Sequence, residues 1–126
     1  AVDLESLEVL AEFGIRFTLL APRQAARVRE MGHGEGWEEV SGGRIDPSRA
    51  YQCFLPSGKS ISLFFYDDPI SQDVAFKGLL NSGEGLARRL TEAFSAERHW
   101  PQLVHIATDG ETYGHHHRFG DQALAY

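Results

Sequence analysis

Three apolar runs, each followed by a helix-like pattern, constrain the fold of this 126-residue chain more than any other feature. They cover residues 15–21, 60–67 and 102–108, and each is apolar or aromatic over most of its length. A strand with one exposed face alternates polar and apolar residues, whereas a strand in a parallel α/β sheet is buried on both faces. The three runs therefore predict an α/β fold with mostly parallel strands.

Local signals predict the other elements. Asp3 and Ser82 are good helix-capping residues, and Gly14 suits the end of a helix. We expect helices at residues 3–13 and 23–31, from Ser71 or Asp73 to about Leu80, from Ser82 through Phe94, and around Ala123, Leu124 and Tyr126. Residues 51–55 and 60–67 predict a β-hairpin that turns at 56–59, and the glycine-rich stretch 32–50 predicts a loop.

Composition excludes several classes of protein. The net charge is −6, from 18 acidic and 12 basic residues, which disfavours nucleic-acid binding through bulk charge. Cys53 is the single cysteine, so no intrachain disulfide can form, as is typical of a reducing, cytoplasmic compartment. No apolar run approaches the roughly 20 residues of a membrane span, and no signal peptide is visible.

The two ends of the sequence suggest a piece of one larger domain. A helix pattern starts at once, and the chain stops inside the apolar stretch 123–126 without a capping residue. Domains usually end in polar, frayed residues. We therefore expect residues 1–126 to be part of a single larger domain, with unpaired strand edges through which it self-associates.

The segment after the third apolar run carries the most chemistry. It reads Asp-Gly-Glu-Thr-Tyr-Gly-His-His-His over residues 109–117. Strand alternation from Leu103 through His105 predicts that Asp109 emerges at the strand tip, partly desolvated and close to Glu111. Burial and a like-charged neighbour both favour a protonated carboxylic acid, which can act as a general acid.

Each of these residues also has a simpler interpretation. An Asp-Gly pair after a strand is an ordinary turn. At most one or two of the three consecutive histidines could share a metal ion, because adjacent side chains point in different directions. A solvent-facing or substrate-stacking role is favoured over a metal site. His105 fits a hydrogen-bonded core residue as well as a ligand. Asp67, at the end of the second run, can contact a substrate or cap the next helix.

Three stretches resemble glycoside hydrolase family 57. Residues 109–114 are similar to its last catalytic motif, an Asp-Gly-Glu followed by an aromatic residue and Gly. The run Phe-Phe-Tyr-Asp-Asp-Pro-Ile-Ser at 64–71, with Phe76, resembles the segment between the two catalytic motifs of the family. The opening helix and residues 14–22, with Gln24, look like the stretch that follows the nucleophile.

The resemblance implies part of a distorted (β/α)7 barrel that hydrolyses or transfers α-glucosidic bonds with retention, without a cofactor or metal. It makes Asp109 the general acid/base and places the nucleophilic Glu upstream of Ala1. Sugar-contacting residues are then expected among five side chains: Asp67, Glu111, Tyr113, His115 and His116. Two alternatives remain: a metal-dependent hydrolase of the polysaccharide-deacetylase type, with ligands among His105, Asp109 and His115–His117, and a non-catalytic carbohydrate-binding module.

Overall fold

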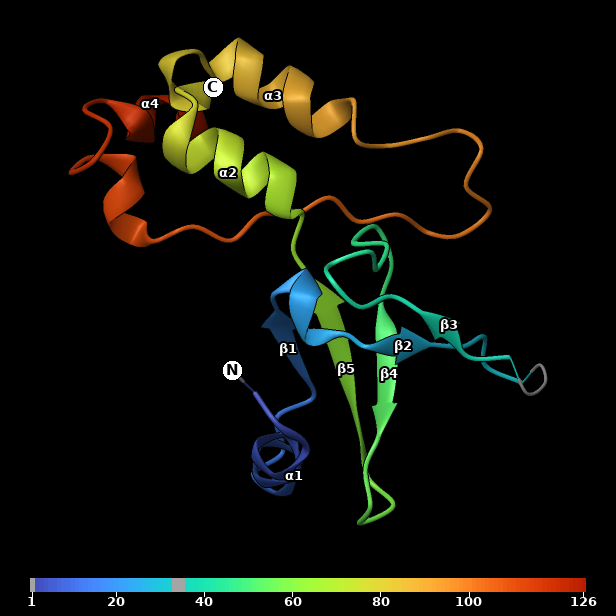
Figure 1. Ribbon diagram of the computed structural model, residues 1–126. Coiled ribbons are helices and arrows are strands. Elements are labelled where there is room, and N and C mark those ends of the chain that lie inside the picture. The colour runs from blue at the N-terminus through green and yellow to red at the C-terminus, as the bar shows by residue number, and fades with distance from the viewer. Residues whose placement is uncertain (1, 33–35) are drawn as a thin grey trace. The chain divides into compact units, whose positions relative to one another are not determined.

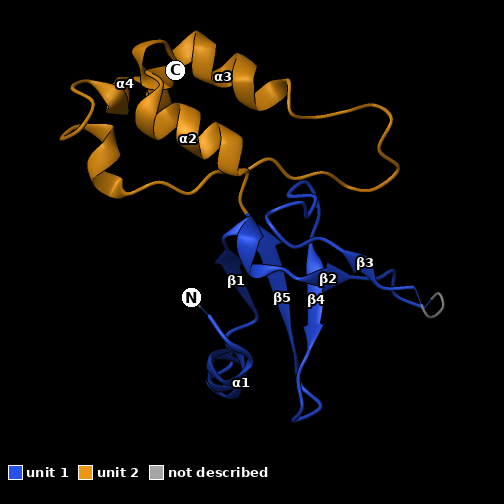
Figure 2. Cartoon of the chain, in the orientation of Figure 1, with its two compact units in different colours: residues 1–65 blue, residues 66–126 orange. Residues whose placement is uncertain are grey.

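The computed structural model describes residues 2–32 and 36–126, so residues 33–35 of the expected loop lie outside the described residues. The chain divides into two compact units, residues 1–65 and 66–126, which are coloured separately in Figure 2. The first unit contains all of the strands, and the second is built from helices and irregular segments (Figure 1). The α/β class is therefore confirmed.

The first unit is organised around a three-stranded sheet. Its elements are α1 (Leu4–Glu12), β1 (Phe17–Leu20), β2 (Arg27–Val28), β3 (Glu38–Glu39), β4 (Tyr51–Phe54) and β5 (Ser60–Phe65), with a short 3₁₀ turn at Pro22–Gln24. The strand order is β1-β5-β4. The β1 and β5 pair is parallel, whereas β4 and β5 form the predicted antiparallel hairpin.

The opening helix forms as its sequence predicts. The Asp3 carboxylate accepts a hydrogen bond from the Ser6 amide at 2.8 Å and so caps α1. At the other end Gly14 adopts a left-handed conformation, φ 79°, and the Ile15 N–H donates to the Leu10 carbonyl at 2.9 Å. This is a Schellman ending, for which glycine is the favoured residue.

One face of the sheet carries the core of the first unit. Leu20, Ile61 and Phe65 point to this face and are buried. Leu7 of α1 packs in one cluster with Leu55 and Ile61, while Leu20 and Phe65 form another with Val40 and Ile45 from the 40–45 loop. The helix and this loop thus cover the inner face.

The outer face of the same sheet carries exposed apolar side chains beside the polar Gln52, Ser60 and Ser62. Phe17 and Leu19 of β1 retain 57% and 48% of their accessible surface, and Phe54 of β4 retains 69%. Phe17 makes an edge-to-face contact with Phe64, at 5.9 Å between ring centroids. The expectation that the strands are buried on both faces is thus met on one face of this sheet.

The helix predicted at 23–31 is wrong. After the 3₁₀ turn the chain becomes extended, and Arg27–Val28 pairs antiparallel with Glu38–Glu39. Val28 then packs on the core, while the guanidinium groups of Arg27 and Arg29 stack on Trp37, 4.9 and 4.8 Å from the ring centroid. Pairing with a distant segment and two cation–π contacts override a local helix preference.

The second unit is a small helical cluster. Its elements are α2 (Asp68–Phe76), α3 (Gly83–Thr91) and α4 (Gly120–Ala125), with 3₁₀ turns at Leu79–Asn81 and Gly110–Tyr113. Its core comprises Val74, Leu80, Leu86 and Ala123. Ser82 caps α3 as predicted, and a helix carries Ala123 and Leu124 as predicted. However, α3 ends before Phe94, which is half exposed.

Two predictions in this unit are corrected, the start of the second helix and the strand at 102–108. The second helix begins at Asp68, three residues before Ser71, because the Asp67 carboxylate caps it and Pro69 fits its first turn. The predicted strand at 102–108 is neither strand nor helix in the structure. The backbone bond from the Asp67 N–H to the His105 carbonyl resembles one between paired strands. The Ala107 N–H donates to the Ser71 hydroxyl and not to a neighbouring strand.

Within the described parts of the chain, every helix is too short or too polar to cross a bilayer.

The core of the first unit yields a stability prediction. Ile61 is fully buried, so the change Ile61→Ala leaves a cavity and should lower the free energy of unfolding by about 2–5 kcal/mol. Ile15→Ala removes the same atoms at a position that is 45% exposed and should cost clearly less. Urea titration followed by circular dichroism measures both. Equal losses would contradict the assignment of Ile61 to the core.

Candidate functional site

Asp109 immediately precedes a hydrogen-bonded turn. Its carbonyl accepts the Thr112 N–H at 3.0 Å, which closes the 3₁₀ turn Gly110–Tyr113. Thr112 is buried, whereas the side chains of Asp109 and Glu111 are exposed. The Asp109 carboxylate does not cap the turn. It is presented to solvent from an ordered segment, and the expectation that a strand tip partly desolvates it is not met.

Glu111, His115 and His116 lie close together in the structure. The amides of both histidines donate to the Glu111 carbonyl at 3.0 Å. Glu111 Oε2 lies 3.5 Å from His116 Nε2, with 74% and 53% of the two side chains exposed. The His115 and His116 rings meet edge to face at 5.0 Å. The loop therefore displays a carboxylate and two imidazoles on one exposed surface.

Tyr113 and His117 are turned toward the body of the second unit. The Tyr113 hydroxyl lies 3.0 Å from Thr108 Oγ1, and the Tyr113 ring packs on the core of the unit. His117 Nε2 lies 2.8 Å from the carbonyl of Ala75 in the last turn of α2. These two contacts fix the loop at both ends. Sequence reasoning assigned no role to Thr108 and considered His117 only as a possible metal ligand, whereas here His117 contacts a backbone carbonyl of α2.

Asp67 performs the capping role that the sequence left open. Its Oδ1 accepts the Ile70 N–H at 2.9 Å, and its carbonyl accepts both the Ser71 N–H and the Ser71 hydroxyl. Its own N–H donates to the His105 carbonyl at 2.9 Å. The last of these bonds brings Asp67 next to the segment that leads to Asp109.

His105 is a partly buried histidine beside this carboxylate. Both ring nitrogens are shielded from solvent. Burial lowers the pKa of His105 from its ordinary value of 6.5, and the negative charge of Asp67 opposes this effect. The neutral imidazole is therefore favoured near neutral pH, as is typical of a core histidine.

The predicted ligands do not assemble around a metal position. Across residues 2–32 and 36–126, no three side chains among His, Cys, Asp and Glu gather closely enough to hold an ion. Glu111 and His116 form a pair, and His117 is directed to a backbone carbonyl of α2. The geometry thus gives no support to a metal-dependent hydrolase.

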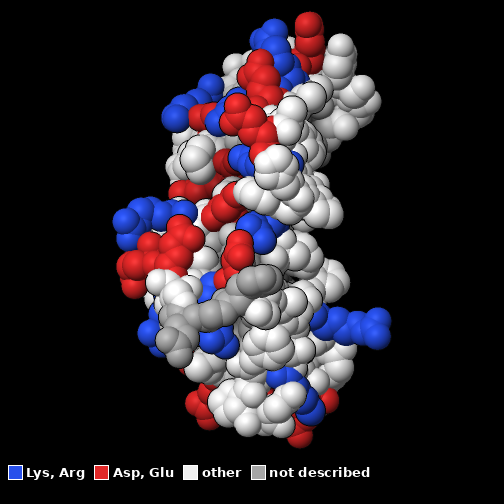
Figure 3. All heavy atoms as spheres, turned by 90° about the vertical axis from the view of Figure 1, so that its right-hand side faces the viewer, with Lys and Arg blue, Asp and Glu red and all other residues white. Residues whose placement is uncertain are grey.

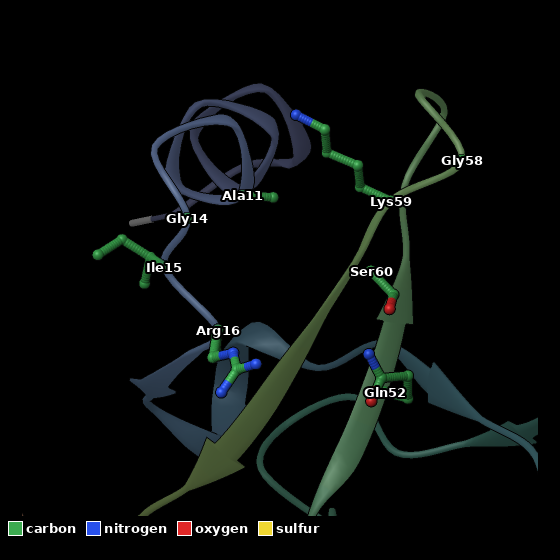
Figure 4. Close-up of a pocket in the computed structure, with 8 residues that line it drawn as sticks. All are labelled: Ala11, Gly14, Ile15, Arg16, Gln52, Gly58, Lys59 and Ser60. Carbon is green, nitrogen blue, oxygen red and sulfur yellow. The ribbon is translucent and has the colours of Figure 1, made fainter.

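A separate hollow of about 550 Å³ lies in the first unit (Figure 4). It is lined by Ala11, Gly14, Ile15, Arg16, Gln52, Gly58, Lys59 and Ser60. Its charged groups, Arg16 and Lys59, are both cationic, and in Figure 4 the Lys59 side chain extends toward α1. No carboxylate and none of the predicted site residues line it, so it is not the site expected from the sequence.

Surface charge is mixed rather than concentrated. On the face shown in Figure 3, Lys and Arg side chains lie among Asp and Glu side chains. This pattern provides no extended basic area there for a phosphate backbone, in line with the net charge of −6.

Comparison with family models, with curated proteins and with solved structures finds no match for this chain. Its function is therefore argued from its own residues.

The Asp67 cap predicts a stability difference between two substitutions. Asp67→Ala removes the acceptor for the Ile70 amide and should lower the free energy of unfolding by about 0.5–2 kcal/mol. Asp67→Asn keeps a capping oxygen and should cost less. Denaturant midpoints of the two variants measure the difference, and equal midpoints would show that the cap contributes little.

His105 predicts a pH dependence of stability. Because burial lowers its pKa in the folded state, the unfolded chain binds the proton more tightly than the folded chain does. The unfolded chain takes up that proton as the pH falls to about 6.5 and below, which favours unfolding. The contribution of His105 to stability is therefore present above pH 6.5 and is lost as the pH drops through that range. His105→Gln should flatten this dependence between about pH 7.5 and about pH 5.5, measured as urea midpoints. An unchanged pH dependence in the variant would contradict it.

Proposed function

We propose that this chain is part of a retaining glycoside hydrolase or transglycosylase of the family 57 type, acting on α-glucosidic bonds. The observation that carries the proposal is the run at 109–114, which folds as one hydrogen-bonded turn with its first carboxylate exposed. In this proposal Asp109 is the general acid/base. The substrate is an α-glucan or oligosaccharide, and no cofactor or metal takes part.

A partial (β/α)7-type barrel belongs to the same proposal. It is supported by the parallel pairing of β1 and β5. It is also supported by the Asp67–His105 backbone bond, since a neighbouring strand would approach the residues after β5 in this way. In such barrels the catalytic residues lie at the carboxyl ends of the strands. Asp67 follows β5 directly, and Asp109 lies four residues after His105.

The mechanism assigns two successive proton transfers to Asp109. It first protonates the glycosidic oxygen as the bond to the leaving sugar breaks. It then removes a proton from the incoming water or sugar hydroxyl, which attacks the glycosyl-enzyme. The nucleophile of a retaining enzyme lies only about 5–5.5 Å from the acid. We place this Glu upstream of Ala1, so the chain by itself is expected to be inactive.

Glu111, His115 and His116 are suited to contact sugar hydroxyls next to Asp109. Carboxylates and imidazoles both hydrogen-bond to hydroxyl groups, and these three side chains are exposed on the same loop. Asp67 belongs to the proposed subsite as well, with the capping bond occupying one of its oxygens. Tyr113 is the fifth proposed sugar-contacting residue.

A cytoplasmic location and self-association complete the proposal. Cys53, the single cysteine, is partly buried in β4, and burial raises the pKa of its thiol. A protonated thiol is a poor nucleophile and is preserved in a reducing compartment. The unpaired edge of β1 is the basis on which we expect self-association.

Asp109→Asn tests the catalytic role. In the protein that carries this chain with its upstream nucleophile, turnover of maltooligosaccharides should fall on the order of 10²–10⁴-fold, because the amide cannot deliver a proton. Asp121→Asn makes the same change at an exposed position of α4 and should retain activity. Circular dichroism checks that both variants are folded.

Leaving-group dependence gives a sharper result. An aryl glucoside whose phenol leaves without protonation should lose much less of its bond-cleavage rate in Asp109→Asn than a maltooligosaccharide does. Unchanged turnover of both substrates would refute the assignment. Activity lost to a chelator and restored by zinc would favour the metal-dependent alternative, and glucan binding without any turnover would favour a binding module.

A further inference from the structure

One contact across the proposed catalytic loop is made by two hydroxyl groups. Thr108 Oγ1 and the Tyr113 hydroxyl lie 3.0 Å apart and form a hydrogen bond. The two residues are five positions apart and enclose Asp109 between them. Both are partly buried, whereas Asp109 is exposed. The bond thus closes a ring of chain whose first enclosed residue is the proposed acid/base.

The rest of the Tyr113 side chain is also engaged. Its ring packs on the cluster of Val74, Leu80, Leu86 and Ala123. The close approach of α4 reinforces this placement, because a Cβ at Gly120 would come within 3.4 Å of the Tyr113 Cα. One end of the tyrosine is therefore held by the core of the unit, and the other by Thr108.

Backbone bonds make the enclosed turn rigid. The Thr112 N–H donates to the Asp109 carbonyl, and three successive amides, those of Gly114, His115 and His116, converge on the Glu111 carbonyl. On either side the segment is tied to α2, through Ser71 and Ala107 before the turn and through Ala75 and His117 after it. The Thr108–Tyr113 bond adds the direct link across Asp109.

We propose that Tyr113 is a positioning residue, which acts with Thr108 to hold the backbone of Asp109, and that its hydroxyl is not a sugar ligand. This inference rests on the proposed function and reassigns one of its residues. A general acid must lie within about 0.5 Å of its productive position, and buried supporting contacts provide that precision. Tyr113 has such contacts at its ring and its hydroxyl, while Glu111, His115 and His116 face solvent.

Two substitutions that remove one hydroxyl each test the positioning role of the Thr108–Tyr113 bond. In Tyr113→Phe and Thr108→Val the bond is lost while the ring or the branched shape remains. We expect kcat on maltooligosaccharides to fall about fivefold to tenfold in each, with KM unchanged. The double variant should be no slower than either single variant, because both remove the same interaction. Thr108→Ser keeps the hydroxyl and should retain turnover.

Sugar contact predicts a different pattern. If the Tyr113 hydroxyl bound substrate, Tyr113→Phe would raise KM, Thr108→Val would not reproduce the effect, and the losses would add. That pattern would overturn the inference. Unchanged kcat in both single variants would overturn it as well.

Amide hydrogen exchange provides a readout that does not depend on activity. In both variants the Thr112 and His115 amides should exchange faster than in the wild type, while the Leu86 amide of α3 should not change. Unchanged exchange at Thr112 and His115 would show that the Thr108–Tyr113 bond does not hold the backbone around Asp109, even in an active enzyme. A wild-type protein that turns over no α-glucan overturns the proposed function and the positioning role, and faster exchange in its variants would then identify the bond as structural only.

Discussion

The candidate site depends on how one irregular segment is held. Residues 101–109 belong to no helix or strand, so their backbone groups need partners from other elements. The amino end of α2 supplies them: the Asp67 amide binds the His105 carbonyl, and the Ser71 hydroxyl accepts the Ala107 amide. The residues that cap a helix therefore also align the path that leads to Asp109.

This arrangement explains which elements could be predicted from the sequence. Asp3, Ser82 and the turn at 56–59 act on residues within a few positions of themselves, so the first helix, α3 and the hairpin could be foreseen. The Asp-Asp-Pro sequence at 67–69 carried a cap and first-turn signal for α2 as well. Ser71 and Asp73 are also capping residue types, and a start at either of them is too late.

Contacts with residues far along the chain explain why the predictions for 23–31 and 102–108 were wrong. The segment 23–31 is extended because it pairs with residues 38–39 and its arginines stack on Trp37, neither of which is visible in a local window. The run 102–108 has the composition of a strand, but a strand requires a continuous neighbouring edge, and here it has one backbone bond at His105. Ile106 packs on the core of the second unit, but Leu103 and Ala107 are exposed. Apolar composition alone therefore predicted neither the pairing nor the burial of the whole run.

The environment of the candidate site residues could not be predicted from the sequence. The sequence placed Asp109, Glu111, His115 and His116 on one loop, and the structure brings the last three together. The expected desolvation of Asp109 required a strand tip that does not form, so its exposure could not be foreseen. In the proposed retaining mechanism one residue has to serve both steps, the cleavage of the glycosidic bond and the hydrolysis of the covalent intermediate, so it has to keep one position throughout. The Thr108–Tyr113 bond and the backbone bonds of the turn are the contacts that we propose hold Asp109 at that position.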